Sequence, residues 1–141
     1  MISCTEFILA YNELFKFLHE NFGKEAVVDF WIYISDKFLN NLDKLVKEKG
    51  IAGMAEYWTH TLTEEKAEYV MDVRENRFSI YMKKCPSVSI MNKRKVKKYK
   101  HYCEHCDILY RRIIEKYGFS YKIKFIDKNK GKCFVMIRKR Y

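Results

Sequence analysis

The chain has 141 residues, the size of one ordinary domain, and 48% of them are hydrophobic, so it can bury a core without disulfides or metal. No apolar run approaches the roughly 20 residues that a membrane span needs. Met1 to Tyr11 also lacks a basic start, an apolar stretch and a cleavage site, so no secretory signal is expected. We therefore predict one soluble cytoplasmic domain, 1–141, with no membrane partner. A homodimer is compatible with this composition.

The formal net charge of +10 is unevenly distributed. Residues 93–100 carry six positive charges, and Arg138 to Arg140 adds three more. Such a run can hold phosphate through counterion release or draw in an anionic small substrate. No nucleic-acid-binding motif accompanies it, and motif and charge are normally required together. We therefore expect a solvated, mobile loop, and nucleic acid is not an expected partner.

The first part of the chain, residues 1–60, is predicted to be helical. Apolar residues recur every three or four positions over 7–22, and a glycine at position 23 offers a stop. A second periodic stretch over 24–50 predicts one long helix of about seven turns. A shorter helix is expected around 54–58, followed by a turn at 61–65.

Residues 69–141 change period and predict two β-hairpins on either side of a helix. Proline after Cys85 ends the first hairpin, because it cannot donate to a strand ladder. The expected elements are strands at 69–74 and 77–83, a polar loop at 87–100, a helix at 102–117, and strands at 119–126 and 133–138. This order predicts an α+β fold, in which an antiparallel four-stranded sheet made of the two hairpins is covered by helices on one face.

Four of the five cysteines lie in this second part, at Cys85, Cys103, Cys106 and Cys133. Cys103 and Cys106 form a C-x-x-C pair that sets two thiols on one helical turn. With Cys85 and Cys133 they could complete a tetrahedral four-sulfur site for zinc or an iron–sulfur cluster. One hypothesis is therefore a small-molecule-binding or sensor domain that holds metal and has no catalytic activity.

The same residues also suit nucleophilic catalysis. A thiol in the first turn of a helix lies near the positive end of the helix dipole, which lowers the thiol pKa. Cys103 and Cys106 both meet this condition, and His105 is close enough to carry a proton. Asp107 could orient an imidazole or a substrate amino group. A third interpretation remains open, because a buried cysteine often acts simply as a small hydrophobic residue.

Three aromatic or imidazole side chains outside the cysteine pair are candidates for binding a substrate. Trp58 and His60 lie at the end of a predicted helix and could wall a ligand pocket. His101 lies two residues before Cys103. The alternative for the first two is an aromatic core anchor and an exposed histidine.

The last 65 or so residues resemble the L-2-amino-thiazoline-4-carboxylic acid hydrolase family. The resemblance rests on Cys85-Pro86, Tyr102-Cys103-Glu104-His105-Cys106-Asp107, Gly118 and the stretch from Gly131 to Ile137. It implies the hydrolytic opening of a small, carboxylated cyclic amidine, a thiazoline, by a cysteine-dependent enzyme. The closing hairpin is also similar to four-vinyl-reductase-type domains, whose fold is shared with haem nitric-oxide sensors and TRAPP subunits. That wider similarity supports the α+β architecture but does not fix the chemistry.

Overall fold

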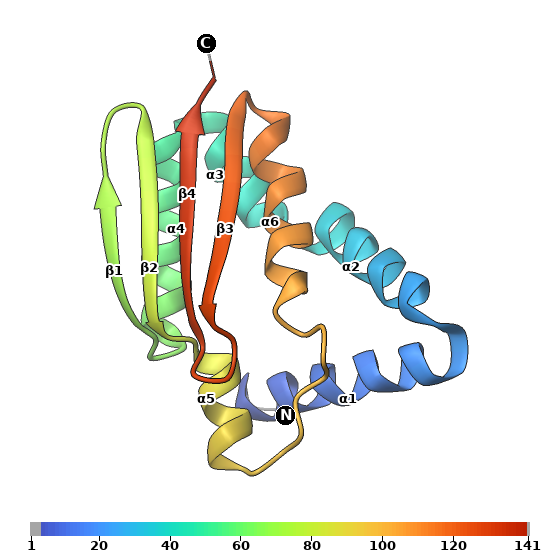
Figure 1. Ribbon diagram of the computed structural model, residues 1–141. Coiled ribbons are helices and arrows are strands. Elements are labelled where there is room, and N and C mark those ends of the chain that lie inside the picture. Colours follow the sequence, from blue (N-terminus) through green and yellow to red (C-terminus); the bar gives the residue numbers. More distant parts are fainter. Residues whose placement is uncertain (1–3, 141) are drawn as a thin grey trace.

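The computed structural model describes residues 4–140, apart from the side chain of Cys4, as helices packed beside a four-stranded antiparallel sheet (Figure 1). The helices are α1 (Cys4–Phe22), α2 (Lys24–Phe38), α3 (Asn40–Lys49), α4 (Ile51–Glu64), α5 (Pro86–Lys93) and α6 (Glu104–Lys116). The strands are β1 (Glu68–Val73), β2 (Arg77–Lys84), β3 (Phe119–Asp127) and β4 (Lys132–Lys139). The α+β class and the two hairpins are therefore confirmed. No helix within 4–140 is both long and apolar enough to cross a membrane.

The sheet has the order β1-β2-β4-β3, so its two hairpins join where β2 pairs with β4. In this register Ile80 lies opposite Val135, and Tyr81 lies opposite Phe134. Because successive side chains of a strand point to opposite faces, Ile80 and Val135 belong to the helix-covered inner face. Tyr81 and Phe134 belong to the outer face. In Figure 1, α3 and α4 lie behind the sheet and α6 runs beside β3.

Two hydrophobic clusters form the core. The larger one fills the space between the inner face of the sheet and helices α3, α4 and α6, and its fully buried members include Leu42, Met54 and Ile137. The smaller one joins α1 and α2 to α5 and the segment before α6, around Phe15 and Trp31. Residues of α6 contact both clusters, so the start of this helix lies where the two meet.

Three local predictions are corrected by the structure. The single helix expected over 24–50 is two helices, because Leu39 leaves helical geometry between α2 and α3. Helix α4 continues through most of the turn expected at 61–65 and ends at Glu64. The loop expected at 87–100 begins with α5, in which Pro86 takes the first position. Proline suits that position, because its missing N–H would have no partner there and its φ is already helical.

The basic run at 93–100 is also packed more closely against the rest of the protein than a solvated loop would be. Tyr99 is only 4% exposed and packs in the smaller cluster. The buried Asn12 of α1 accepts a hydrogen bond from the backbone N–H of Tyr99 (2.7 Å) and donates one to the carbonyl of Lys97 (2.9 Å). These bonds attach the backbone of the run to α1, although most of its cationic side chains remain exposed.

Candidate functional site

A cavity of about 180 Å³ lies between the inner face of the sheet, α4, and the first turns of α5 and α6. Its polar wall holds three thiols, from Cys85, Cys106 and Cys133, together with His105 and Glu65. The rest of its lining is mostly apolar or aromatic: Tyr57, Trp58, Leu62, Ile80, Met82, Pro86, Tyr110, Tyr121, Ile123 and Val135. An apolar cavity with a few convergent polar groups is the usual form of a small-molecule site.

Strand pairing and one glycine bring two of the thiols together. Cys133 lies opposite Met82 on β2 and Phe125 on β3, which places it on the inner face. The N–H of Cys85 donates to the carbonyl of Gly131 at 2.9 Å. Gly131 has a φ of +70°, and a Cβ added there would lie 2.8 Å from the Cβ of Cys85. Only glycine allows the β3–β4 turn to approach Cys85 so closely.

His105 and Cys106 form a hydrogen-bonded pair at the start of α6. Nδ1 of His105 bonds the backbone carbonyl of Tyr102, which can only accept, so the imidazole donates from Nδ1. Its Nε2 is then left as an acceptor in the neutral ring, and it lies 3.7 Å from Sγ of Cys106. The arrangement is that of a nucleophile, a base and a group that orients the base.

Burial determines the charge state of this pair. It raises the pKa of the Cys106 thiol to about 12, with smaller contributions from the carboxylates of Glu65 and Asp107. Burial also lowers the pKa of His105. Both shifts favour a neutral thiol beside a neutral imidazole. Desolvation therefore acts against the Cys106 thiolate that the helix dipole is expected to favour.

The other two cavity thiols are also neutral. Burial raises the pKa of Cys85 and that of Cys133 to about 12. The backbone amides of Ser87 and Val88 lie close to the sulfur of Cys85 and act to lower its pKa. Neither amide forms a hydrogen bond with this side chain that caps α5. Nearby thiols add to the rise at both positions, which shows that the cysteines interact electrostatically across the cavity.

Glu65, which directly follows α4, is a cavity residue that sequence reasoning missed. Although much of this residue is exposed, desolvation and the neighbouring Glu64 raise the pKa of its carboxyl, while His105 acts to lower it. Glu65 was assigned to a turn, and nothing in its local sequence connects it to the cysteines. Tyr110 also lines the cavity. The sequence does indicate this residue, because it lies one helical turn after Cys106 on the same face of α6.

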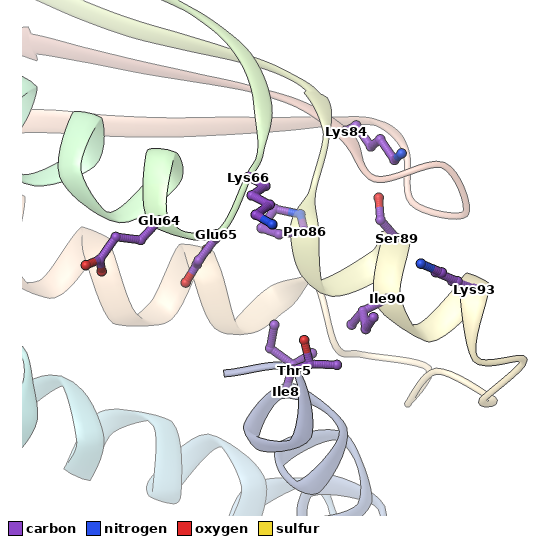
Figure 2. A pocket seen from close by; sticks show the side chains of 10 residues that line it. All are labelled: Thr5, Ile8, Glu64, Glu65, Lys66, Lys84, Pro86, Ser89, Ile90 and Lys93. Carbon is purple, nitrogen blue, oxygen red and sulfur yellow. The ribbon is translucent and has the colours of Figure 1, made fainter. Parts of the chain in front are cut away.

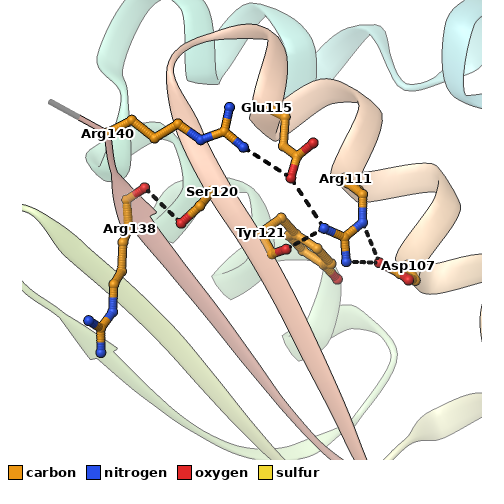
Figure 3. Close-up of polar contacts among 7 residues, drawn as sticks. All are labelled: Asp107, Arg111, Glu115, Ser120, Tyr121, Arg138 and Arg140. Carbon is orange, nitrogen blue, oxygen red and sulfur yellow. Dashed lines mark hydrogen bonds and ion pairs between the residues drawn. The ribbon is translucent and has the colours of Figure 1, made fainter.

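Two of the predicted catalytic residues do not line the cavity. Cys103 precedes α6 and lies 3.8 Å from Nζ of Lys98; burial raises the pKa of its thiol and Lys98 counteracts the rise. Asp107 accepts hydrogen bonds from the guanidinium of Arg111 at 2.6 and 2.9 Å. Figure 3 shows Arg111 held between Asp107, Glu115 and the carbonyl of Tyr121. Asp107 thus orients an arginine instead of an imidazole.

Of the three predicted substrate-binding residues, one reaches the cavity. Trp58 lines it and stacks on Phe78. The side chain of His60 is 71% exposed and lies 3.5 Å from Glu64, at the surface. His101 pairs with Glu104 and stacks on His19, away from the cavity wall.

The four-cysteine metal site is not formed. Among the described residues, which include all four of these cysteines, no group of three or more His, Cys, Asp or Glu side chains could hold a metal ion. Cys103 is directed toward Lys98, and burial keeps the other three thiols protonated.

A groove of about 520 Å³ with a charged lining adjoins the cavity and shares Glu65 and Pro86 with it. Figure 2 shows Glu65 and Lys66 at the end of α4, with Ser89 and Lys93 on α5. Lys84, at the end of β2, also lines the groove. The thiol cavity is thus next to a groove in which three lysines lie with two glutamates, Glu64 and Glu65.

No protein-family model matches the chain, and no curated protein matches it. The function of this site is therefore argued from its geometry alone.

Proposed function

We propose that the protein is a cysteine-dependent hydrolase that opens a small, carboxylated cyclic amidine such as a 2-amino-thiazoline-4-carboxylate. The observation that carries this proposal is the pair formed by Cys106 and His105. Nε2 of His105 accepts from Sγ of Cys106 at 3.7 Å, and the carbonyl of Tyr102 holds the ring in that orientation. The pair lies on the wall of a cavity of ligand-binding character, where general-base activation of a neutral thiol is possible.

The proposed reaction uses the Cys106–His105 pair as follows. The thiol of Cys106 gives its proton to Nε2 of His105 as the sulfur bonds to the amidine carbon, and the C=N π electrons move to nitrogen. The ring C–S bond then breaks as the C=N bond re-forms, and the departing sulfur takes the proton from His105 and becomes a thiol. Water adds to the same carbon and loses a proton to His105, which returns it to Cys106 as the enzyme C–S bond breaks. One water is consumed, a carbamoyl product forms, and no electron donor or acceptor is needed.

The size and charge of the two spaces support the substrate class. The cavity is smaller than the roughly 300 Å³ at which drug-sized pockets begin, so it suits a single small ring. Its apolar lining would penalise a buried carboxylate. The adjoining groove offers Lys66, Lys84 and Lys93 beside Glu64 and Glu65, and the three lysines would hold that carboxylate outside the cavity while the ring enters it.

The test is turnover of L-2-amino-thiazoline-4-carboxylate by the purified protein, followed by mass spectrometry of a product heavier by one water. We expect Cys106→Ser to abolish turnover and Cys103→Ser to retain it, because Cys103 lies outside the cavity. The two substitutions are chemically identical and three residues apart, so the second controls for loss of a thiol in this region.

Two results would contradict the proposal. One is full activity of Cys106→Ser in a folded protein. The other is the absence of turnover with this substrate and with related cyclic amidines. A bound thiazoline that protects Cys106 from alkylation without being hydrolysed would indicate a binding domain instead.

A further inference from the structure

The outer face of the sheet carries aromatic and basic side chains that the thiol cavity does not use. Strand register places Tyr81 of β2 between Val70 of β1 and Phe134 of β4, and Phe134 in turn lies opposite Lys124 of β3. The next row on this face includes Met136 opposite Lys122. The helices pack on the other face (Figure 1). Alternating positions of the same strands thus form a second, separate surface.

The charge of this surface is predominantly positive. Lys122, Lys124 and Arg138 are exposed, and in the described part of the chain none of the three takes part in an ion pair. Figure 3 shows the side chain of Arg138 extended away from the cluster around Arg111. Asp72, on the edge strand β1, is already paired with Arg77 and with Arg74. The two strands β3 and β4 therefore present uncompensated cations beside Phe134.

We propose that this outer face binds single-stranded nucleic acid. Bases stack on aromatic rings of an open four-stranded sheet, and cations along the strands hold the phosphates. Tyr81 and Phe134 are half-buried, so each ring is fixed by its neighbours while part of it stays accessible. A second copy of the chain is a poorer occupant, because pairing two such faces would bring like charges together.

The basic run at 93–100 does not indicate this site. That run lacks a nucleic-acid-binding motif, so the sequence does not predict nucleic acid as a partner. The aromatic and basic residues are up to 57 positions apart in the chain, from Tyr81 to Arg138, and only strand pairing makes them neighbours. The proposal is independent of the hydrolase, since it uses none of the residues that line the cavity.

The experiment is fluorescence anisotropy of a labelled single-stranded RNA of about 12 nucleotides, within the range that single domains cover. DNA of the same sequence, the matching duplex and heparin are measured in parallel over a salt series. We expect single strands to bind more tightly than duplex or heparin. The double variant Tyr81→Ala, Phe134→Ala should lose at least about tenfold in affinity, with folding checked by circular dichroism and thermal melting.

A charge-matched pair of variants locates the site. Lys122→Gln, Lys124→Gln should weaken binding and reduce the slope of log affinity against log salt by about 1.4, the value for two phosphate contacts on a single strand. Lys95→Gln, Lys97→Gln, in the basic run, should change the slope little. Equal losses in the two pairs, heparin binding as tight as RNA binding, or no binding at low salt would each overturn the proposal.

Discussion

The two faces of the sheet differ in chemistry although the same strands make both. On the inner face, Cys133, Val135 and Ile137 of β4 meet the helices and line or support a cavity whose thiols are neutral. On the outer face, the intervening Phe134 and Met136 lie beside exposed lysines. Because side chains alternate along a strand, the eight residues of β4 contribute to two surfaces of different chemistry. The comparison shows that neighbours in sequence can have unrelated roles.

The largest expected effect concerns the inner face and its nucleophile. Cys106→Ser should lower kcat/KM for the thiazoline by at least about 10³-fold, since removing a covalent nucleophile commonly costs that much or more. Steady-state kinetics on both variants, with Cys103→Ser as the control, measure the effect. A loss of similar size in Cys103→Ser would mean that the cavity is not the reaction site.

Thiol reactivity gives the next effect. With a pKa of about 12, Cys85, Cys106 and Cys133 should hold about 10³ times less thiolate near neutral pH than an ordinary cysteine of pKa about 8.5. Alkylation by iodoacetamide, followed by peptide mapping, should therefore be much slower in the folded protein than in urea. Cys103, outside the cavity and beside Lys98, should react before the other three. Rapid labelling of Cys106 in the folded protein would show that its thiolate is populated.

Substitutions at two adjacent positions of β4, one on each face of the sheet, should differ in how much they lower the free energy of unfolding. Ile137 is fully buried in the larger cluster, so Ile137→Ala should lower the free energy of unfolding by about 2–5 kcal/mol. Met136, on the outer face, is partly exposed, and Met136→Ala should cost less than about 1 kcal/mol. Urea denaturation of both variants measures the difference. Equal losses would indicate that the outer face is covered in solution.

The smallest expected effect is the pH dependence caused by His105. Its pKa is lowered in the fold from an ordinary value of 6.5, so the unfolded chain takes up a proton before the folded protein does. The stability it contributes is complete above about pH 6.5 and is lost as the pH falls from there toward the folded-state pKa. Urea denaturation at several pH values should show this slope, and His105→Gln should reduce it. An unchanged slope in that variant would assign the effect to other groups.

The sequence by itself determined the elements whose pattern is local. The alternation at 119–126 and 133–138 predicted β3 and β4, and the period of α6 placed Cys106 and Tyr110 on one face. It also singled out His105, Trp58 and four cysteines, three of which line the cavity. Local periodicity is sufficient for such predictions, because the geometry of a strand or helix fixes which residues share a face.

Only the tertiary structure decided which of these residues meet and in what state. Glu65 lines the cavity together with Trp58 and Leu62 of α4, the helix that it follows. Asp107, in contrast, is bound by Arg111, and Cys103 is directed toward Lys98. The thiol pKa values follow from burial against elements distant in sequence. The outer surface of Tyr81, Phe134 and Lys124 exists only because β2, β4 and β3 pair in one register. Desolvation and strand pairing are long-range effects, so no local pattern encodes them.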